Sequence, residues 1–188
     1  MRGNLVKKLP NILSTIRICL VPVFIAVYFT EEGTVKVYSA LVYAVAAFTD
    51  FLDGYLARKY GNISNLGKVL DPLGDKLMTV AVMACITIDG IIPFWAVLVA
   101  FCKEALMGIG GLVMHRKLKS EIPPSNILGK LSTVTFFLVC VTLMLVEGIS
   151  RTVATVMISV AIGLMLAALG SYITTYVDVI KKRKSNSF

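Results

Sequence analysis

The sequence predicts an all-α polytopic membrane protein with six transmembrane helices, and three observations support this fold class. The 188 residues are 57% hydrophobic, above the roughly 45–50% of ordinary soluble domains, and the mean hydropathy is +0.82. The apolar residues form six runs, each close to the roughly 20 residues that a helix needs to cross a bilayer. The sequence has no ten-residue alternating pattern of the kind that indicates a membrane β-barrel, so helices are the structure expected to span the lipid.

The six predicted helices occur in the order of the apolar runs. They cover residues 12–29, 35–58, 71–88, 91–115, 127–146 and 152–178. The pair Asp89-Gly90 is typical of a turn and separates the third run from the fourth. The pair Pro123-Pro124 ends any helix in the loop before the fifth run. The second run ends among charged residues, and the sixth follows a short polar break.

We treat residues 1–188 as a single transmembrane domain. Residues 1–10 are predicted to form a short interfacial segment, and residues 179–188 form a basic tail. Small residues allow helices to pack closely, and close packing is predicted at glycines of two helices. They are Gly108, Gly110 and Gly111 in the fourth predicted helix, and Gly163 and Gly170 in the sixth.

Basic residues gather on one side of the predicted topology. That side has 14 lysines and arginines, against Lys36 and Arg151 on the other side. Because Lys and Arg are enriched in cytoplasmic loops, we expect a multi-pass protein of the cell membrane with both termini in the cytoplasm. The net charge of +8 fits anionic membrane lipids as partners, and no nucleic acid, in a chain this apolar. The 14 residues are Arg2, Lys7, Lys8, Arg58, Lys59, Lys68, Arg116, Lys117, Lys119, Lys130, Lys181, Lys182, Arg183 and Lys184.

Four aspartates lie where the second and third predicted helices meet the cytoplasmic side. Asp50 and Asp53 are three residues apart near the end of one helix, and Asp71 and Asp75 are four apart at the start of the next. Either spacing puts both carboxylates on one helix face. The short connecting loop lets the two pairs face each other, so we expect the four carboxylates to converge at the membrane boundary.

These aspartates are read either as ordinary helix-end charges or as metal ligands. An aspartate at the centre of a membrane helix costs about 2.5–3.5 kcal/mol, and less towards the ends. Four neighbouring carboxylates also repel each other, and no matching set of cations stands one turn away from each. Two divalent ions would neutralise them, and ligands that are all oxygen favour Mg²⁺, Mn²⁺ or Ca²⁺ over zinc. The pattern therefore favours a site for two metal ions.

Small residues and an arginine accompany the aspartates in the sequence. Small side chains let a bulky ligand approach the backbone, and arginine is suited to binding phosphate. Together with the metal ions, they indicate a diphosphate site. The residues are Gly54, Ala57, Arg58 and Gly67.

The stretch that carries these residues reads D-F-L-D-G-Y-L-A-R, then eight residues, then G-K-V-L-D-P-L-G-D. It resembles the signature of the CDP-alcohol phosphotransferase family, and matches all eight fixed positions and all spacings of that signature. The opening Asn11-Ile12-Leu13-Ser14, with Arg17 and Pro22, is similar to that of the branch that makes phospholipids. Together with six helices, the resemblance covers most of the chain.

The resemblance implies a role for each matching residue. Asp50, Asp53 and Asp71 would bind two Mg²⁺ or Mn²⁺ ions, and Asp75 would lie close to a metal and act as the general base. The glycines, alanine and arginine of the signature would contact the cytidine diphosphate. The reaction would be attack of an alcohol on the β-phosphorus of CDP-diacylglycerol, with CMP leaving towards the cytoplasm. The family also implies a homodimer.

The acceptor alcohol is less clearly indicated. A branch of the family uses glycerol 3-phosphate, which gives phosphatidylglycerophosphate, and the phosphate of this phosphorylated alcohol acceptor would need basic residues. Lys103 is open to two interpretations, because it can bind the acceptor or form an ion pair with Glu104 or an aspartate. Gly111 stands where that branch commonly has a second arginine. The candidate acceptor-binding residues are Lys130, Lys103, Arg116 and Arg17.

Two alternatives remain open at this point. Cardiolipin synthesis in the same family uses phosphatidylglycerol, an acceptor with a single phosphodiester charge that needs fewer basic groups, and the missing arginine fits that substrate. A divalent-cation transporter would also place aspartates inside a membrane. Transporter sites, however, lie near the bilayer midplane on broken helices, whereas these aspartates lie at one end beside a glycine, an alanine and an arginine.

Overall fold

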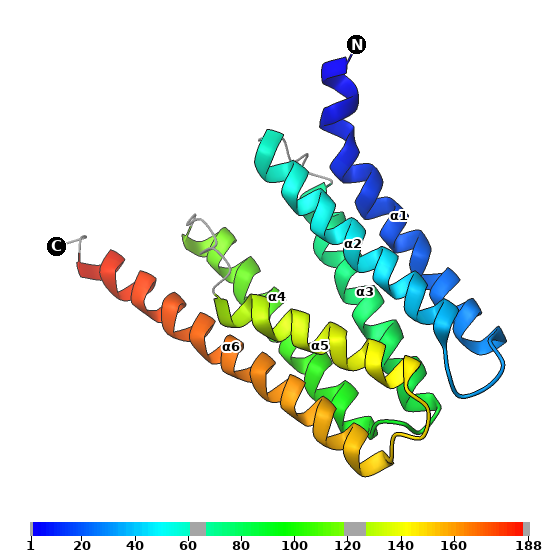
Figure 1. The fold of residues 1–188 in the computed structure, drawn as a ribbon. Helices are drawn as coiled ribbons and strands as arrows, with labels where there is room; N and C mark the ends of the chain where they lie inside the picture. The colour runs from blue at the N-terminus through cyan, green and yellow to red at the C-terminus, as the bar shows by residue number, and fades with distance from the viewer. Residues whose placement is uncertain (1, 61–66, 119–126, 186–188) are drawn as a thin grey trace. The chain divides into compact units, whose positions relative to one another are not determined.

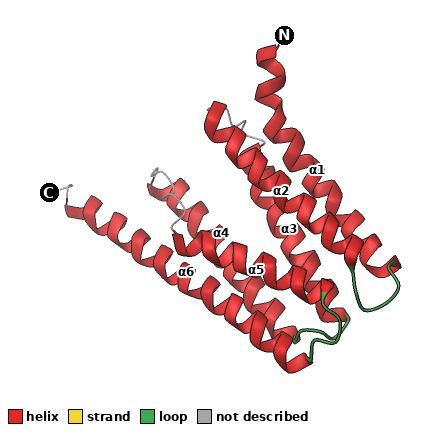
Figure 2. Ribbon diagram, in the orientation of Figure 1, coloured by secondary structure: helices red, strands yellow, loops and turns green. Residues whose placement is uncertain are grey.

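The computed structural model describes residues 2–60, 67–118 and 127–185, and the side chains of 12–53, 55, 74–107 and 127–174. Every regular element in the described part of the chain is a helix, and there are six (Figures 1 and 2). The predicted all-α fold class is confirmed. The helices are α1 (Arg2–Thr30), α2 (Val37–Tyr60), α3 (Gly67–Ile88), α4 (Phe94–Leu118), α5 (Ile127–Leu145) and α6 (Arg151–Ser185).

The helix ends differ from the predicted ones for identifiable reasons. Helix α4 begins at Phe94, three residues later than expected, because Pro93 precedes it and proline favours the start of a helix. Helix α6 continues through the basic tail to Ser185, since lysine and arginine are good helix formers. The expected turn at Asp89-Gly90 is present, with Gly90 at φ +73°, a conformation that favours glycine.

The N-terminal segment is continuous with the first predicted span. Helix α1 runs from Arg2 without interruption, so residues 1–10 do not form a separate element. A proline within a helix removes one backbone hydrogen bond, and the helix nevertheless continues past Pro10. The expected position of this segment at the membrane surface stays a prediction.

The helices form two compact units. The first comprises Met1–Ile91 with Val141–Ile149, and the second comprises Ile92–Cys140 with Ser150–Phe188. In the first unit, α1 packs against both α2 and α3, and α2 also packs against α3. Its core contains buried aromatic residues, with the Phe24 ring centroid 5.8 Å from that of Tyr28 and 6.4 Å from that of Tyr43. The assignment of all 188 residues to one domain stays a prediction.

The turn between α1 and α2 is held by a cluster of hydrogen bonds. The Glu31 carboxylate accepts bonds from the backbone N–H groups of Tyr38 (2.9 Å) and Ser39 (3.1 Å) and from the Ser39 hydroxyl (2.9 Å). It therefore caps the first turn of α2, whose amide groups have no partner within the helix. Lys36 Nζ donates to the Glu31 carbonyl at 2.6 Å, and the Lys36 N–H donates to the carbonyl of Met144 in α5 at 2.7 Å.

Neutralising Glu31 is expected to destabilise this turn in a pH-dependent way. Although burial raises it, the hydrogen bonds from Tyr38 and Ser39, together with Lys36, hold the pKa of Glu31 below its ordinary value of 4.5. The folded state therefore favours the ionised form, and this stabilisation is present above pH 4.5 and lost as the pH falls through the lowered pKa. At pH 7, Glu31→Gln is expected to lower Tm by about 2–4 °C, and the difference from wild type should shrink below pH 4.

The measurement is thermal unfolding in detergent at pH 7 and below pH 4. Glu32→Gln removes the same charge one residue further on and is the matched control, with little change expected in Tm. An equal effect of the two substitutions, or a Glu31→Gln effect that does not depend on pH, would contradict the capping role.

In the second unit, α4 packs against α6. The buried residues of α6 recur every three or four positions, as Ala154, Ile158, Ala161, Met165 and Ala168. This spacing defines one helix face, on which alanine allows close packing.

The glycines of α6 lie at no helix contact within the described part of the chain, so the close packing expected of them stays a prediction. Gly163 and Gly170 are both exposed, and a Cβ atom added at either would meet no described atom within 4 Å. Small size alone does not put a residue at a helix contact, because the face is set by the periodicity of all the apolar residues. The alanines of α6, rather than its glycines, are buried.

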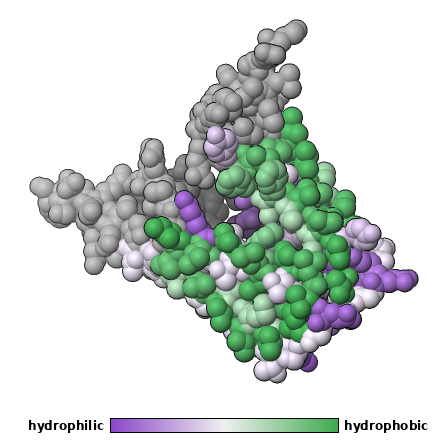
Figure 3. Space-filling model, in the orientation of Figure 1, coloured by the Kyte–Doolittle hydropathy of each residue, from purple (hydrophilic) through white to green (hydrophobic). Residues whose placement is uncertain are grey.

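Three segments among the described residues are long and apolar enough to cross a membrane. They are Ile12–Thr30, Ile127–Leu145 and Arg151–Thr174. Hydrophobic side chains cover much of the described surface (Figure 3), as expected of helices in contact with lipid. The chain is therefore a membrane protein. The full count of six spans stays a prediction.

Candidate active site

Asp50 and Asp53 lie on one face of α2, and both contact Arg17 of α1. Arg17 Nη1 is 2.8 Å from Asp50 Oδ1, and Arg17 Nη2 is 2.5 Å from Asp53 Oδ2. Arg17 and Asp53 are almost fully buried, with exposed fractions of 1% and 3%, whereas the Asp50 side chain is 47% exposed. The pair therefore has one carboxylate in the interior of the first unit and one that solvent reaches.

This contact was not predicted from the sequence. A cation one turn away on the same helix would be evident from spacing, but the partner of Asp50 and Asp53 comes from another helix, 36 residues earlier than Asp53. Arg17 also lies inside the candidate span Ile12–Thr30, where an unpaired arginine costs up to about 2.5–3.5 kcal/mol. A buried arginine in an apolar run is costly without a partner of opposite charge, and this rule is the signal that could have indicated the pair. That Arg17 binds the acceptor stays a prediction.

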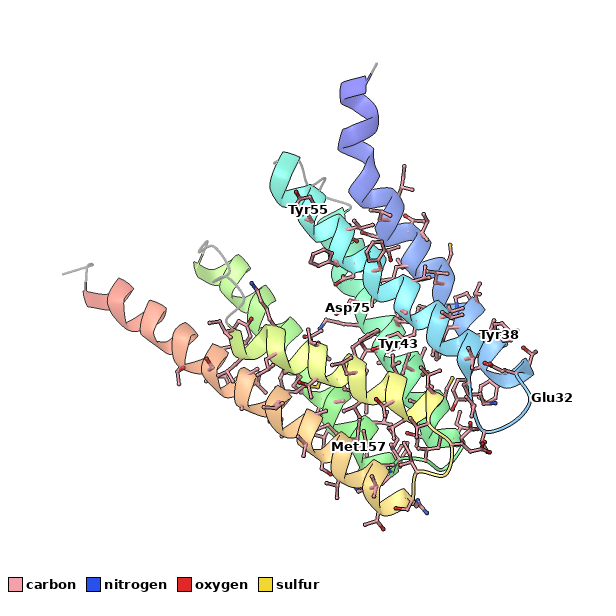
Figure 4. The ribbon with its side chains drawn as sticks, viewed as in Figure 1. Glu32, Tyr38, Tyr43, Tyr55, Asp75 and Met157 are labelled. Carbon is pink, nitrogen blue, oxygen red and sulfur yellow. The ribbon has the colours of Figure 1, made fainter. Side chains whose placement is uncertain are left out.

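Helix α3 carries the second pair of aspartates. Asp75 is exposed on this helix (Figure 4). Asp71 lies one turn earlier in α3, and its side chain is outside the described part. Between them, Gly74 is buried against α1, since a Cβ atom added there would lie 3.5 Å from Arg17 Cδ and 3.4 Å from Ile18 Cγ1. The first helix therefore contacts both elements that carry aspartates.

The donor set fits a hard divalent cation. Carboxylate oxygens are the ligands that Mg²⁺ and Mn²⁺ prefer, and Arg17 contacts one oxygen of each α2 carboxylate. Among the described side chains, no three His, Cys, Asp or Glu residues come together as a metal site. Because the side chain of Asp71 is not among them, the convergence of all four aspartates stays a prediction.

The predicted nucleotide-binding residues lie in the last turns of α2 and at the first residue of α3. Gly54, Ala57 and Arg58 belong to the last two turns of α2, and Gly67 is the first residue of α3. The positions of their side chains lie outside the described residues. The helix bounds put Asp50, Gly54 and Ala57 at i, i+4 and i+7, which is one helix face.

Three of the predicted acceptor-binding residues belong to the second unit. Lys103 in α4 is 8% exposed, and its Nζ is 2.5 Å from Glu104 Oε1. Of the two interpretations of Lys103, an ion pair with Glu104 is therefore present. Lys130 is exposed in the first turn of α5, and Arg116 lies near the end of α4 with its side chain outside the described part. The fourth candidate, Arg17, belongs to the first unit.

Comparison with known proteins identifies the family. A model of the CDP-alcohol phosphatidyltransferase family matches residues 7–179. A CDP-diacylglycerol–glycerol-3-phosphate 3-phosphatidyltransferase of Bacillus subtilis is 32% identical over 137 residues, which are 66% of this chain and 70% of that protein. A cardiolipin synthase (CMP-forming) of Streptomyces coelicolor is 33% identical over 144 residues, 74% of this chain and 66% of that protein.

A shorter stretch shows higher identity. A CDP-diacylglycerol–glycerol-3-phosphate 3-phosphatidyltransferase of Rickettsia typhi is 40% identical over 82 residues. This match spans less than half of each protein, 44% of this chain and 44% of the relative. The family model, by contrast, covers nearly the whole chain, including both aspartate pairs, the whole of α2 to α5 and most of α1 and α6. The chain belongs to the CDP-alcohol phosphatidyltransferase family.

Proposed function

We propose that this protein transfers a phosphatidyl group from CDP-diacylglycerol to glycerol 3-phosphate, producing phosphatidylglycerophosphate and CMP. The observation that carries the proposal is the aspartate pair on one face of α2, held by Arg17, within a complete eight-position signature of the family. The names of the relatives from Bacillus subtilis and Rickettsia typhi support glycerol 3-phosphate as the acceptor.

The proposed reaction is a displacement at phosphorus. The acceptor hydroxyl oxygen forms a bond to the β-phosphorus, and the bond from this phosphorus to the oxygen that bridges it to the α-phosphorus breaks, so CMP leaves. Asp75, which is exposed on α3, takes the proton of the hydroxyl. Asp50, Asp53, Asp71 and Asp75 would hold two Mg²⁺ or Mn²⁺ ions, which supply positive charge to the diphosphate when bound.

The remaining residues of the signature have binding roles in this proposal. Gly54, Ala57, Arg58 and Gly67 contact the cytidine diphosphate, with Arg58 as a donor to phosphate. Lys130 is the leading candidate for the phosphate of the acceptor, because its side chain is exposed in the first turn of α5. Lys103 is buried and paired with Glu104, and Arg116 and Arg17 complete the predicted group.

We further propose that the site faces the cytoplasm, with both termini on that side of the cell membrane, and that two copies form a homodimer. The excess of basic residues on one side of the helices supports the orientation. A green fluorescent protein fused to the C-terminus is expected to fluoresce, because the C-terminus is proposed to lie in the cytoplasm. A fusion without fluorescence would indicate the opposite orientation in the membrane. Native mass spectrometry in detergent tests the dimer.

The proposed reaction is tested by turnover of the purified protein. CDP-diacylglycerol and Mn²⁺ are supplied with radiolabelled glycerol 3-phosphate or with phosphatidylglycerol in separate reactions, and CMP release is followed. Labelled phosphatidylglycerophosphate is expected from the first reaction. CMP release with phosphatidylglycerol alone would instead establish cardiolipin synthesis, the second candidate, which the relative from Streptomyces coelicolor and the glycine at position 111 favour.

Removing the Lys130 side chain is expected to weaken binding of the acceptor selectively. If its ammonium binds the acceptor phosphate, Lys130→Ala should raise the KM for glycerol 3-phosphate about 10- to 100-fold, the usual cost of a hydrogen bond to a charged group. The KM for CDP-diacylglycerol should change little. Arg151→Ala, which removes an exposed cation at the start of α6, is the matched control. Equal increases in both KM values would exclude Lys130 as an acceptor ligand.

A further inference from the structure

Arg17 is a cation outside the eight-position signature, and it contacts two of the signature's aspartates. It lies on α1, whereas both carboxylates lie on α2. The contacts are made by different nitrogens of the guanidinium, Nη1 to Asp50 and Nη2 to Asp53. One planar group therefore sets the positions of two carboxylates relative to each other.

The geometry of these contacts requires arginine. Its guanidinium presents donors in a rigid fork, whereas the lysine ammonium is a single flexible point of charge. The fork reaches Asp50 Oδ1 at 2.8 Å and Asp53 Oδ2 at 2.5 Å. Two contacts made by one rigid group restrict the rotation of both carboxylates.

Burial shows that the pair is more than a surface ion pair. Arg17 and Asp53 are nearly excluded from solvent, whereas Asp50 is half exposed. Buried ion pairs often stabilise a fold no better than apolar residues of the same volume. Stability alone therefore gives a weak reason for a buried arginine in an apolar helix, and a role in arranging the carboxylates gives a stronger one.

Gly74 connects the same arginine to the second pair of aspartates. A Cβ atom at this position would come within 3.5 Å of Arg17 Cδ and 3.6 Å of the Ser14 carbonyl oxygen. Such a Cβ atom would be in ordinary van der Waals contact, so the α3 backbone passes beside the arginine, one residue before Asp75. The Arg17 side chain thus lies next to α3 along its aliphatic part and contacts α2 at its charged end.

From these contacts we infer that Arg17 is a positioning residue for the metal ligands. It orients the Asp50 and Asp53 carboxylates from α1 so that their oxygens are arranged for a divalent cation before the cation arrives. Outer groups that bond to metal ligands commonly act in this way. The inference depends on the proposed function, in which these aspartates bind the metal ions.

A competing role makes the opposite prediction. Arg17 would instead be a placeholder, a cation that occupies the carboxylates and has to be displaced by the metal. Removing a placeholder tightens metal binding, whereas removing a positioning residue weakens it. Two substitutions separate charge from geometry, because Arg17→Lys keeps the charge and loses the fork, and Arg17→Met loses both.

The test is a titration of the metal-free protein with Mn²⁺, followed by the electron paramagnetic resonance signal of the free ion. Arg17→Lys is expected to weaken Mn²⁺ binding about 10- to 100-fold, and Arg17→Met to weaken it as well. Lys36→Met is the matched control, because it removes a cation that is hydrogen-bonded in the same unit. This control is expected to lower Tm while leaving Mn²⁺ affinity unchanged.

The outcomes separate the inference from the proposed function. Wild-type Mn²⁺ binding together with unchanged or tighter binding in Arg17→Lys would overturn the positioning role and leave the proposed function in place. Absence of Mn²⁺ binding in the wild-type protein would overturn both. If Arg17→Met does not fold, Arg17→Lys alone decides, since it retains the charge and nearly the same length.

Discussion

Replacing Asp75 with asparagine is expected to lower kcat by about 10²- to 10⁴-fold, the contribution of a positioned general base. Asparagine is nearly the same size but cannot accept the proton of the acceptor hydroxyl at neutral pH. Asp75 is exposed on α3, and asparagine occupies nearly the same volume, so the fold should be retained. Binding of CDP-diacylglycerol, measured by isothermal titration calorimetry, is expected to persist.

The control for this substitution is Asp89→Asn. Asp89 follows the other end of α3 and accepts a hydrogen bond from the Tyr28 hydroxyl at 2.8 Å, so its loss affects stability without touching the proposed site. Turnover by Asp89→Asn should remain close to wild type. If Asp75→Asn also turns over normally, another group must take the proton.

The sequence predicted the helices well because their main determinants are local. Apolar runs of about 20 residues can satisfy their backbone groups in a membrane only as helices or closed barrels, so six runs gave six helices. The sharp turn at Asp89-Gly90 has a similarly local cause, since glycine adopts a positive φ readily. Helix ends within charged segments were predicted less well. Lysine and arginine are good helix formers, so no local signal ends the helix in the basic segment of α6.

The contacts between helices depend on tertiary packing, and there the sequence predicted less. The i, i+3 spacing puts Asp50 and Asp53 on one face, but no periodicity indicates which residue of α1 lies opposite that face. Arg17 was assigned to the acceptor group by resemblance, while its guanidinium lies on these two carboxylates. Likewise, the glycines of α6 resembled contact residues, yet alanines occupy its buried face.

Removing the Asp53 carboxylate is expected to cause the largest loss of stability. Asp53→Ala leaves the buried Arg17 with Asp50 as its remaining contact in this pair, and breaking a buried ion pair from one side costs about 3–5 kcal/mol. The free energy of unfolding, measured by reversible unfolding in mixed detergent micelles with chelator present, should fall by about 3 kcal/mol. Turnover should be lost too, because Asp53 is a proposed metal ligand.

A second substitution separates these two losses. Arg17→Met in the Asp53→Ala background removes the buried cation that has lost its Asp53 contact, so the double variant should be more stable than the sum of the single effects predicts, by about 1–3 kcal/mol. Tyr28→Phe combined with Asp53→Ala is the control for additivity, because Tyr28 lies about 16 Å from Arg17 along α1. Turnover should stay absent in the double variant even though its fold is restored. Recovery of both stability and turnover would mean that the buried pair has only a structural role. Recovery of stability without turnover is the expected result. It would indicate that these carboxylates are retained for metal binding although they lower the stability of the fold.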